Sequence, residues 1–313
     1  MTARNIIKLS IKITIIAIIL FFLGRSVISN WERVRRYDWS FNPVLMAVSF
    51  MIFCLAYTFL PWIWRKLLYY MGYEISFGDA WDIFYIGNLG RYIPGKVWTI
   101  AGMAYMAEKV GIPATIAGTS VVFANAYSLV SSFVFFILFL ILRGTYSTSG
   151  GFLWLLPVFF IMAVVFIFPY NLERVLNVVL KRFGKNHVKI GITTLTALKI
   201  VALYFVSGVL FGFAFWIFIT AFIGWGLINP LFAASAYIIA YWIGFLAFFV
   251  PGGLGVREGT LGLLFMGYIP AGVLIIIAGL SRLAVTIIEI LFVVIALLRK
   301  GFFYGKEKAS AKK

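Results

Sequence analysis

The chain reads Gly87-Asn88-Leu89-Gly90-Arg91-Tyr92-Ile93-Pro94-Gly95-Lys96-Val97-Trp98 in the middle of an apolar stretch, residues 80–111. A second apolar stretch, residues 231–269, is broken in the same way and reads Phe249-Val250-Pro251-Gly252-Gly253-Leu254-Gly255-Val256-Arg257-Glu258-Gly259. A shift of 157 residues aligns the two breaks, with nine identities in 29 positions and no gap. Because the chain has only 9 prolines, the matching Pro-Gly and Pro-Ala pairs indicate an internal repeat.

The composition around these breaks is that of a membrane protein. Hydrophobic residues make up 63% of the 313 residues and charged residues 12%, whereas soluble domains have roughly half and about a quarter. The 27 Lys and Arg outnumber the 10 Asp and Glu, a formal charge of +17 that is typical of loops facing an anionic cytoplasmic leaflet. The basic residues lie between apolar spans without a nucleic-acid-binding motif, so we expect no nucleic-acid partner.

Six apolar runs are long enough to cross a bilayer, which takes about 20 residues. They are Ile6–Leu23, Pro43–Trp64, Ala114–Leu142, Phe152–Tyr170, Leu198–Ile223 and Ala271–Leu298. The first run has basic flanks, but residues 21–25 offer no small-residue cleavage site, and we predict an uncleaved helix. The sequence therefore predicts an all-α polytopic membrane protein, with residues 1–313 forming a single integral membrane domain.

The distribution of Lys and Arg predicts how these spans are oriented. The basic segment 174–199 and the tail 299–313 should be cytoplasmic. Following the predicted spans back from these segments places the N terminus on the cytoplasmic side too. The loop 24–42 then lies outside although it carries four arginines, which we accept as one violation of a statistical rule. In this topology the helix at 43–64 runs inward, and its counterpart in the repeat, at 198–223, runs outward.

The two halves, about residues 1–156 and 157–313, are thus predicted to form an inverted repeat. Each broken stretch is interpreted as a re-entrant hairpin, with a short helix in, a Pro-Gly turn and a short helix back. In transporters of this design, broken helices meet near the membrane midplane and hold the substrate. Non-helical backbone at that depth is tolerated only where it is buried in protein or lines a water-filled cavity. The alternative is a passive bundle with two proline-kinked helices.

The turns of the two hairpins are candidate anion sites. Glycine allows close backbone approach, and a helix that restarts after the turn presents free N–H groups. The predicted turn-forming residues are Pro94, Gly95, Pro251, Gly252, Gly253 and Gly255. Beside the turns lie Asn88 and the cations Arg91, Lys96 and Arg257, whose charge suits a phosphate. The alternative is that these cations extend to the lipid headgroups and have no substrate role.

Charged residues also occur inside the last span, where they are costly and usually face a cavity or the bundle interior. Arg282 and Glu289 are seven residues apart and therefore share a face, and the repeat aligns Asn125 with Arg282. Glu258 is the nearest expected partner of Arg282. We interpret this set as substrate-binding. The alternatives are a structural ion pair and a proton-coupling carboxylate, Glu258 or Glu108.

The sequence offers no sign of catalysis or of a cofactor. Cys54 is the only cysteine and His187 the only histidine, which leaves no disulfide and no cysteine or histidine cluster for a metal. The chain has no nucleotide-binding loop and no catalytic motif. We therefore expect a protein that is not an enzyme and binds neither a cofactor nor a metal.

The motifs Arg91-Tyr92-Ile93-Pro94-Gly95-Lys96 and Pro251-Gly252-Gly253-Leu254-Gly255-Val256-Arg257-Glu258-Gly259 resemble the transmembrane region of lysylphosphatidylglycerol synthases, a flippase-like family. The resemblance covers nearly the whole chain. In the two-part synthase a cytoplasmic aminoacyltransferase makes the modified lipid, and the membrane region moves it to the outer leaflet. Here only the tail 299–313 follows the last helix, so we expect the transferase to be missing. The resemblance implies lipid translocation without lipid synthesis.

These observations lead to one main functional prediction and two alternatives. The main prediction is a lipid translocase in the plasma membrane of a prokaryote, moving an anionic phospholipid or a polyprenyl phosphate-linked glycolipid between leaflets. The first alternative is a membrane glycosyltransferase that uses a polyprenyl-phosphate sugar. The second is a non-catalytic partner subunit. The expected partner is a membrane lipid, and a homodimer is one possible oligomeric state.

Overall fold

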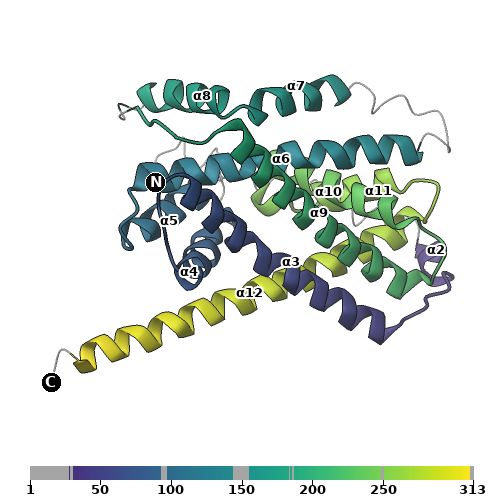
Figure 1. The fold of residues 1–313 in the computed structure, drawn as a ribbon. Coiled ribbons are helices and arrows are strands. Elements are labelled where there is room, and N and C mark those ends of the chain that lie inside the picture. The colour runs from purple at the N-terminus through teal and green to yellow at the C-terminus, as the bar shows by residue number, and fades with distance from the viewer. Residues whose placement is uncertain are drawn as a thin grey trace, which may run out of the picture.

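The computed structural model describes residue 28 and residues 31–92, 97–143, 155–182, 184, 187–247 and 250–310, and these residues form helices and connecting turns without a β-strand (Figure 1). The α-helices are α2 (Trp31–Arg35), α3 (Pro43–Tyr70), α4 (Phe77–Asn88), α5 (Val97–Glu108), α6 (Ala114–Arg143), α7 (Leu155–Ile167), α8 (Pro169–Arg182), α9 (Thr194–Ile223), α10 (Pro230–Leu246), α11 (Val256–Leu264) and α12 (Ala271–Ser310). Two short 3₁₀ helices, η1 (Leu89–Tyr92) and η3 (Pro251–Gly253), lie at the two breaks. The all-α prediction is confirmed for this part of the chain.

Four helices are long and apolar enough to cross a membrane, namely α3, α6, α9 and α12. They coincide with four of the predicted spans, although α3 and α12 extend beyond the predicted ends. The predicted span 6–23 lies outside the described residues. The prediction of one helix ending at Tyr170 is wrong, because the chain bends by 92° between α7 and α8. Pro169, at the start of α8, has no N–H with which to continue the helix α7.

Helices α3 and α9 pack against each other and run in opposite directions. Just before α3, the Asn42 N–H donates to the carbonyl of Ala221 near the end of α9, at 2.9 Å. The far ends also meet, since Ile63 of α3 and Ala197 of α9 belong to one buried cluster. The N terminus of α3 is fixed by the Asn42 side chain, which accepts hydrogen bonds from the first free N–H groups of the helix.

The elements at the two breaks pack in matching ways. Helix α4 lies on α5 and α12, whereas α10 lies on α11 and α6, and η1 touches η3. Glycines permit the close crossings: a Cβ added to Gly87 would come within 2.5 Å of Met103 Cγ, and one added to Gly253 within 2.6 Å of the Gly244 carbonyl oxygen. The two breaks therefore meet inside the bundle and position a common site.

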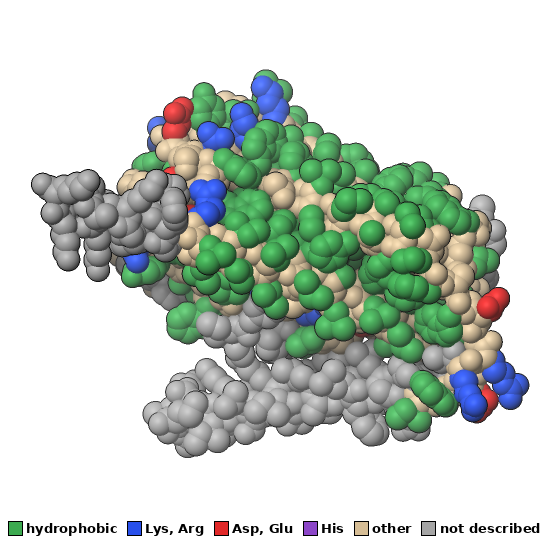
Figure 2. All heavy atoms as spheres, turned by 90° about the horizontal axis from the view of Figure 1, so that it is seen from below, with side chains coloured by type: hydrophobic (Ala, Val, Ile, Leu, Met, Phe, Trp, Pro, Cys, Tyr) green, Lys and Arg blue, Asp and Glu red, His purple; other side chains and the backbone are tan. Residues whose placement is uncertain are grey.

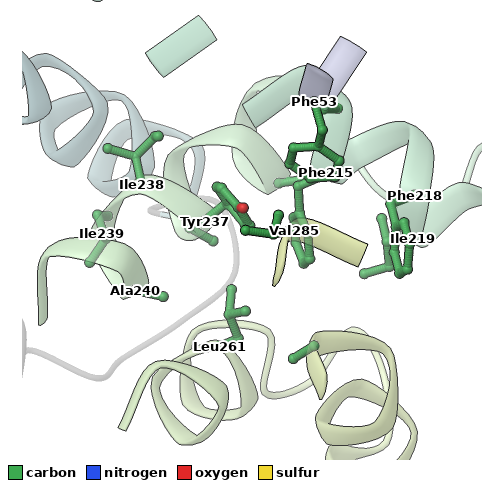
Figure 3. Close-up of a cluster of buried hydrophobic side chains, with 14 of the residues drawn as sticks. Phe53, Phe215, Phe218, Ile219, Tyr237, Ile238, Ile239, Ala240, Leu261 and Val285 are labelled. Carbon is green, nitrogen blue, oxygen red and sulfur yellow. The ribbon is translucent and has the colours of Figure 1, made fainter. Parts of the chain in front are cut away.

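The main buried hydrophobic cluster combines aromatic and aliphatic side chains. Side chains from α3, α9, α10, α11 and α12 converge there, among them Phe53, Phe215, Tyr237, Leu261 and Val285 (Figure 3). On the outside, hydrophobic side chains cover the middle of the face in Figure 2, and charged side chains gather toward its two ends. This is the surface that a bilayer requires, with an apolar band between two polar ends.

Candidate functional site

A cavity of about 510 Å³ lies between the two breaks, within the range of roughly 300–1,000 Å³ typical of ligand pockets. The middle of α3, α6 and α12 contributes to its wall, through residues such as Tyr57, Asn125 and Thr286. Because these three helices are three of the four candidate spans, the cavity lies near half their depth. The polar and charged side chains in the wall are Tyr57, Trp64, Tyr85, Asn88, Arg91, Thr99, Asn125, Ser128, Tyr204, Tyr241, Arg257, Arg282, Thr286 and Glu289.

At the first break, Arg91 of η1 forms an ion pair with Glu289 of α12. Glu289 is buried, and its Oε1 also accepts a hydrogen bond from the Tyr57 hydroxyl at 2.7 Å. The hydroxyl of Tyr85 in turn donates to the Tyr57 carbonyl at 2.6 Å. Buried charges persist in a protein when they are paired and hydrogen-bonded, and this network meets both conditions. It connects the first break to α3 and α12.

At the second break, Arg282 of α12 forms an ion pair with Glu258 of α11 at 2.9 Å. The same guanidinium donates through Nη2 to the Gly252 carbonyl at 2.7 Å. Glu258 also accepts from the Gly255 N–H at 2.6 Å and so caps α11. The predicted pairing of Glu258 with Arg282 is confirmed. Gly252 and Gly255, like Gly253, have positive φ, which glycine adopts without steric penalty.

Arg257 differs from the other two arginines in the cavity wall. No described carboxylate forms an ion pair with it, and its guanidinium instead lies 4.3 Å from the ring centroid of Tyr237. The Tyr237 ring is held in place by stacking on Phe215, with 4.6 Å between the ring centroids. The Nη2 atom of Arg257 is buried and has no hydrogen-bond partner, a costly state for a charged donor.

The structure brings together most of the predicted site residues. Asn88, Arg91, Asn125, Arg257, Arg282 and Glu289 all line the cavity, as does Gly252, and Glu258 lies directly behind Arg282. Pro94, Gly95 and Lys96 lie outside the described residues. Glu108, the other carboxylate considered for proton coupling, is exposed at the end of α5 and does not line the cavity.

Sequence reasoning missed the tyrosines of the cavity wall. Tyr57, Tyr85, Tyr204 and Tyr241 come from four different helices, and each lies in an apolar run rich in aromatic residues. Within such a run, nothing distinguishes a tyrosine whose hydroxyl faces a cavity from one at a membrane interface. Only the fold brings the four together.

A further ion pair lies outside the cavity and connects α4 to the C-terminal part of α12. Arg299 Nε is 3.6 Å from Oδ1 of the buried Asp82. A Cβ added to Gly78 would collide with the same guanidinium, so the small residue makes room for this contact. With Arg282 and Glu289, α12 thus supplies one partner to every described ion pair except Arg36–Glu32.

The fold and the cavity define a helical membrane protein with a charged cavity near the middle of its candidate spans. The sequence profile of the lysylphosphatidylglycerol synthase TM region matches residues 9–292, most of the chain. The protein therefore belongs to this family, as its motifs suggested, and the match supports a membrane protein of a lipid-related, transporter-like kind. A comparison with curated proteins finds no match.

Proposed function

We propose that this protein is a lipid translocase that moves an anionic phospholipid or a polyprenyl phosphate-linked glycolipid between the leaflets of a prokaryotic plasma membrane. It is not an enzyme in this proposal. The observation that carries it is the convergence of Arg91, Arg257 and Arg282 on one cavity at mid-depth between two helix breaks. Arginines so far from the membrane surfaces are costly, and an anionic headgroup in transit would give them a use.

The proposal includes an inverted repeat, and the packing of the helices supports it. Helices α3 and α9 occupy equivalent positions in the two halves and run antiparallel. The contacts of α4 with α12 correspond to those of α10 with α6, and η1 meets η3. These are the relations that a two-fold axis in the membrane plane would generate, and such an axis suits a site that opens to either leaflet in turn. In this proposal each break is a re-entrant hairpin, and both termini are cytoplasmic.

The wall of the cavity suits a headgroup whose acyl or prenyl tails stay in the bilayer. Its charged groups come from the breaks and from α12, while Val97 lines the cavity and is also exposed. The neighbouring Trp98 and the nearby Leu89 are exposed as well. A headgroup could thus enter beside α5 while its tails lie along this apolar edge.

The proposal is tested with Arg257→Gln and Arg282→Gln. Each purified variant is reconstituted into proteoliposomes that carry a fluorescent anionic phospholipid, and leaflet exchange is followed by quenching of the label from outside. We expect both variants to lose exchange by more than about tenfold, since a hydrogen bond to a charged group contributes about 1.5–3 kcal/mol. Lys66→Gln, a change on α3 at a residue absent from the cavity wall, is the control. Exchange at the wild-type rate in both folded arginine variants would refute the assignment.

A further inference from the structure

Helix α8 lies at one end of the bundle, away from the cavity. The chain bends by 92° between α7, which packs on the span α6, and α8. Leu172 of α8 is buried in one cluster with Leu67, near the end of α3, and Ala197, near the start of α9. The helix is therefore placed where α3 leaves the membrane and α9 enters it, which is the cytoplasmic end in the proposed orientation.

One face of α8 is fixed to the protein. Its three leucines belong to or pack against the cluster of α3 and α9. The Asn177 side chain donates to the Val188 carbonyl and accepts from the Val188 N–H, both at 2.9 Å. Glu173 accepts from the Ile190 N–H at 3.0 Å. Because Glu173 is the only carboxylate within residues 169–199, the single acidic group of this segment is used to hold the inner face.

The opposite face of α8 combines cations with apolar side chains. Val178 is four residues from Arg174 and three from Lys181, so the three side chains are neighbours on the helix surface. Among the described residues, no carboxylate forms an ion pair with a cation of this face. The exposed residues that make up the face, called the outer face of α8, are Tyr170, Arg174, Val175, Val178, Lys181 and Arg182.

The composition of the outer face suits the boundary between lipid and water. Val175 and Val178 are 51% and 66% exposed, and Tyr170, at the start of the helix, is 70% exposed. Tyrosine is enriched at membrane interfaces, and an amphipathic helix with a basic polar side lies in the plane of the interface. Lysine and arginine there lay their stems along apolar surface and reach the headgroups. An acidic protein segment would satisfy the cations but leave the valines without a use.

We infer that the outer face of α8 is a peripheral binding surface for anionic phospholipids of the leaflet at this end of the bundle. Arg174, Lys181 and Arg182 contact the headgroups, and Val175 and Val178 contact the upper part of the acyl chains. No residue of the outer face lines the cavity, so these lipids are bound at the edge of the protein and are not the ones moved between leaflets. The inference is therefore independent of the translocase proposal.

Quenching of a fluorophore on α8 by labelled lipids tests the inference. The fluorophore is attached to Val178→Cys in a Cys54→Ala background, and the full-length protein is reconstituted into phosphatidylcholine proteoliposomes. Phosphatidylglycerol or phosphatidylcholine with a nitroxide on the upper acyl chain is then added in increasing amounts. We expect half-quenching at a more than about fivefold lower fraction of phosphatidylglycerol, the effect of one cation near an anionic surface. The preference should weaken in about 1 M salt, where charges are screened beyond about 3 Å.

A matched pair of double variants makes the test specific to the outer face. Arg174→Gln with Lys181→Gln should bring the ratio of the two lipids close to one. Arg35→Gln with Arg36→Gln removes the same total charge at exposed positions before α3 and should leave the ratio unchanged. Equal ratios in the two double variants, or equal quenching by both lipids in the unaltered face, would overturn the inference. Quenching by aqueous iodide and by neither lipid would overturn it too, since the face would then be in water, as a protein-binding surface is.

Discussion

Glu258 shows how much of the site depends on single side chains. Its Oε2 accepts from the Gly255 N–H and its Oε1 from Arg282 Nη1, so both oxygens of this buried carboxylate are in use. A buried ion pair adds little net stability, but the loss of one partner leaves the other charge uncompensated. Glu258 therefore holds the cap of α11 and the charge of Arg282 at the same time.

The change Glu258→Ala should consequently lower the free energy of unfolding by about 3–5 kcal/mol, the usual effect of breaking a buried pair. Unfolding in detergent, followed by circular dichroism against denaturant concentration, measures this loss. Glu74→Ala removes an exposed carboxylate and should change stability by less than about 0.5 kcal/mol. Equal losses of unfolding free energy in the two variants would show that the Glu258–Arg282 pair does not stabilise the fold.

Which residue contacts could be predicted depended on their separation in the chain. The Glu258–Arg282 pair could be predicted from the sequence because the segment that contains Glu258 leads directly into the last span. The Arg91–Glu289 pair joins the first break to the last helix, and no local pattern brings such distant residues together. The cation–π contact of Arg257 with Tyr237 depends in the same way on how α10 lies against α11.

At the scale of the elements, the crossing of α4 and α5 depends on Gly87. A Cβ at this position would lie 2.5 Å from Met103 Cγ and 2.9 Å from Met103 Cα, and a backbone atom cannot move aside as a side chain can. Met103 also belongs to the cavity wall. The spacing between these two helices thus sets part of the shape of the site.

We expect Gly87→Ala to destabilise the protein by about 1–3 kcal/mol through overpacking and to slow lipid exchange. The comparison is Gly279→Ala in α12, where an added Cβ meets nothing within 4 Å; removing a helical glycine there should stabilise by roughly 0.5–1 kcal/mol. Thermal unfolding and the exchange assay are run on both variants. If both alanine variants raise the melting temperature, the close crossing of α4 and α5 does not require glycine at position 87.

Elements were predictable where the sequence pattern is strong and local. The two breaks and four of the spans follow from apolar runs and Pro-Gly pairs. Helix α8 was missed because its basic residues made the segment resemble a solvated loop. Its leucines at positions 172, 176 and 180 recur every four residues and face inward, and Asn177 fixes it through hydrogen bonds to the Val188 backbone. That periodicity was the available signal.

For the whole molecule, the antiparallel arrangement of α3 and α9 implies that the loop before α3 and the loop before α9 lie on opposite sides of the membrane. In a Cys54→Ala background, Asp38→Cys, just before α3, should react with a membrane-impermeant maleimide added outside intact cells. His187→Cys, before α9, should react only after permeabilisation. Both positions are exposed. The reverse pattern would invert the proposed orientation, and labelling of both residues from one side would contradict the antiparallel crossing of the membrane.

Helix α12 connects the two breaks and helix α4 through ion pairs. It holds the first break through Glu289, the second through Arg282 and the helix α4 through Arg299. Arg282 and Glu289 are two turns apart on one rigid helix. A rotation of α12, or a shift along its axis, would therefore disturb the ion pairs of both residues at the same time. In the proposed translocase the two halves would therefore move together, and we expect the cavity to open in a single concerted step with one rate constant.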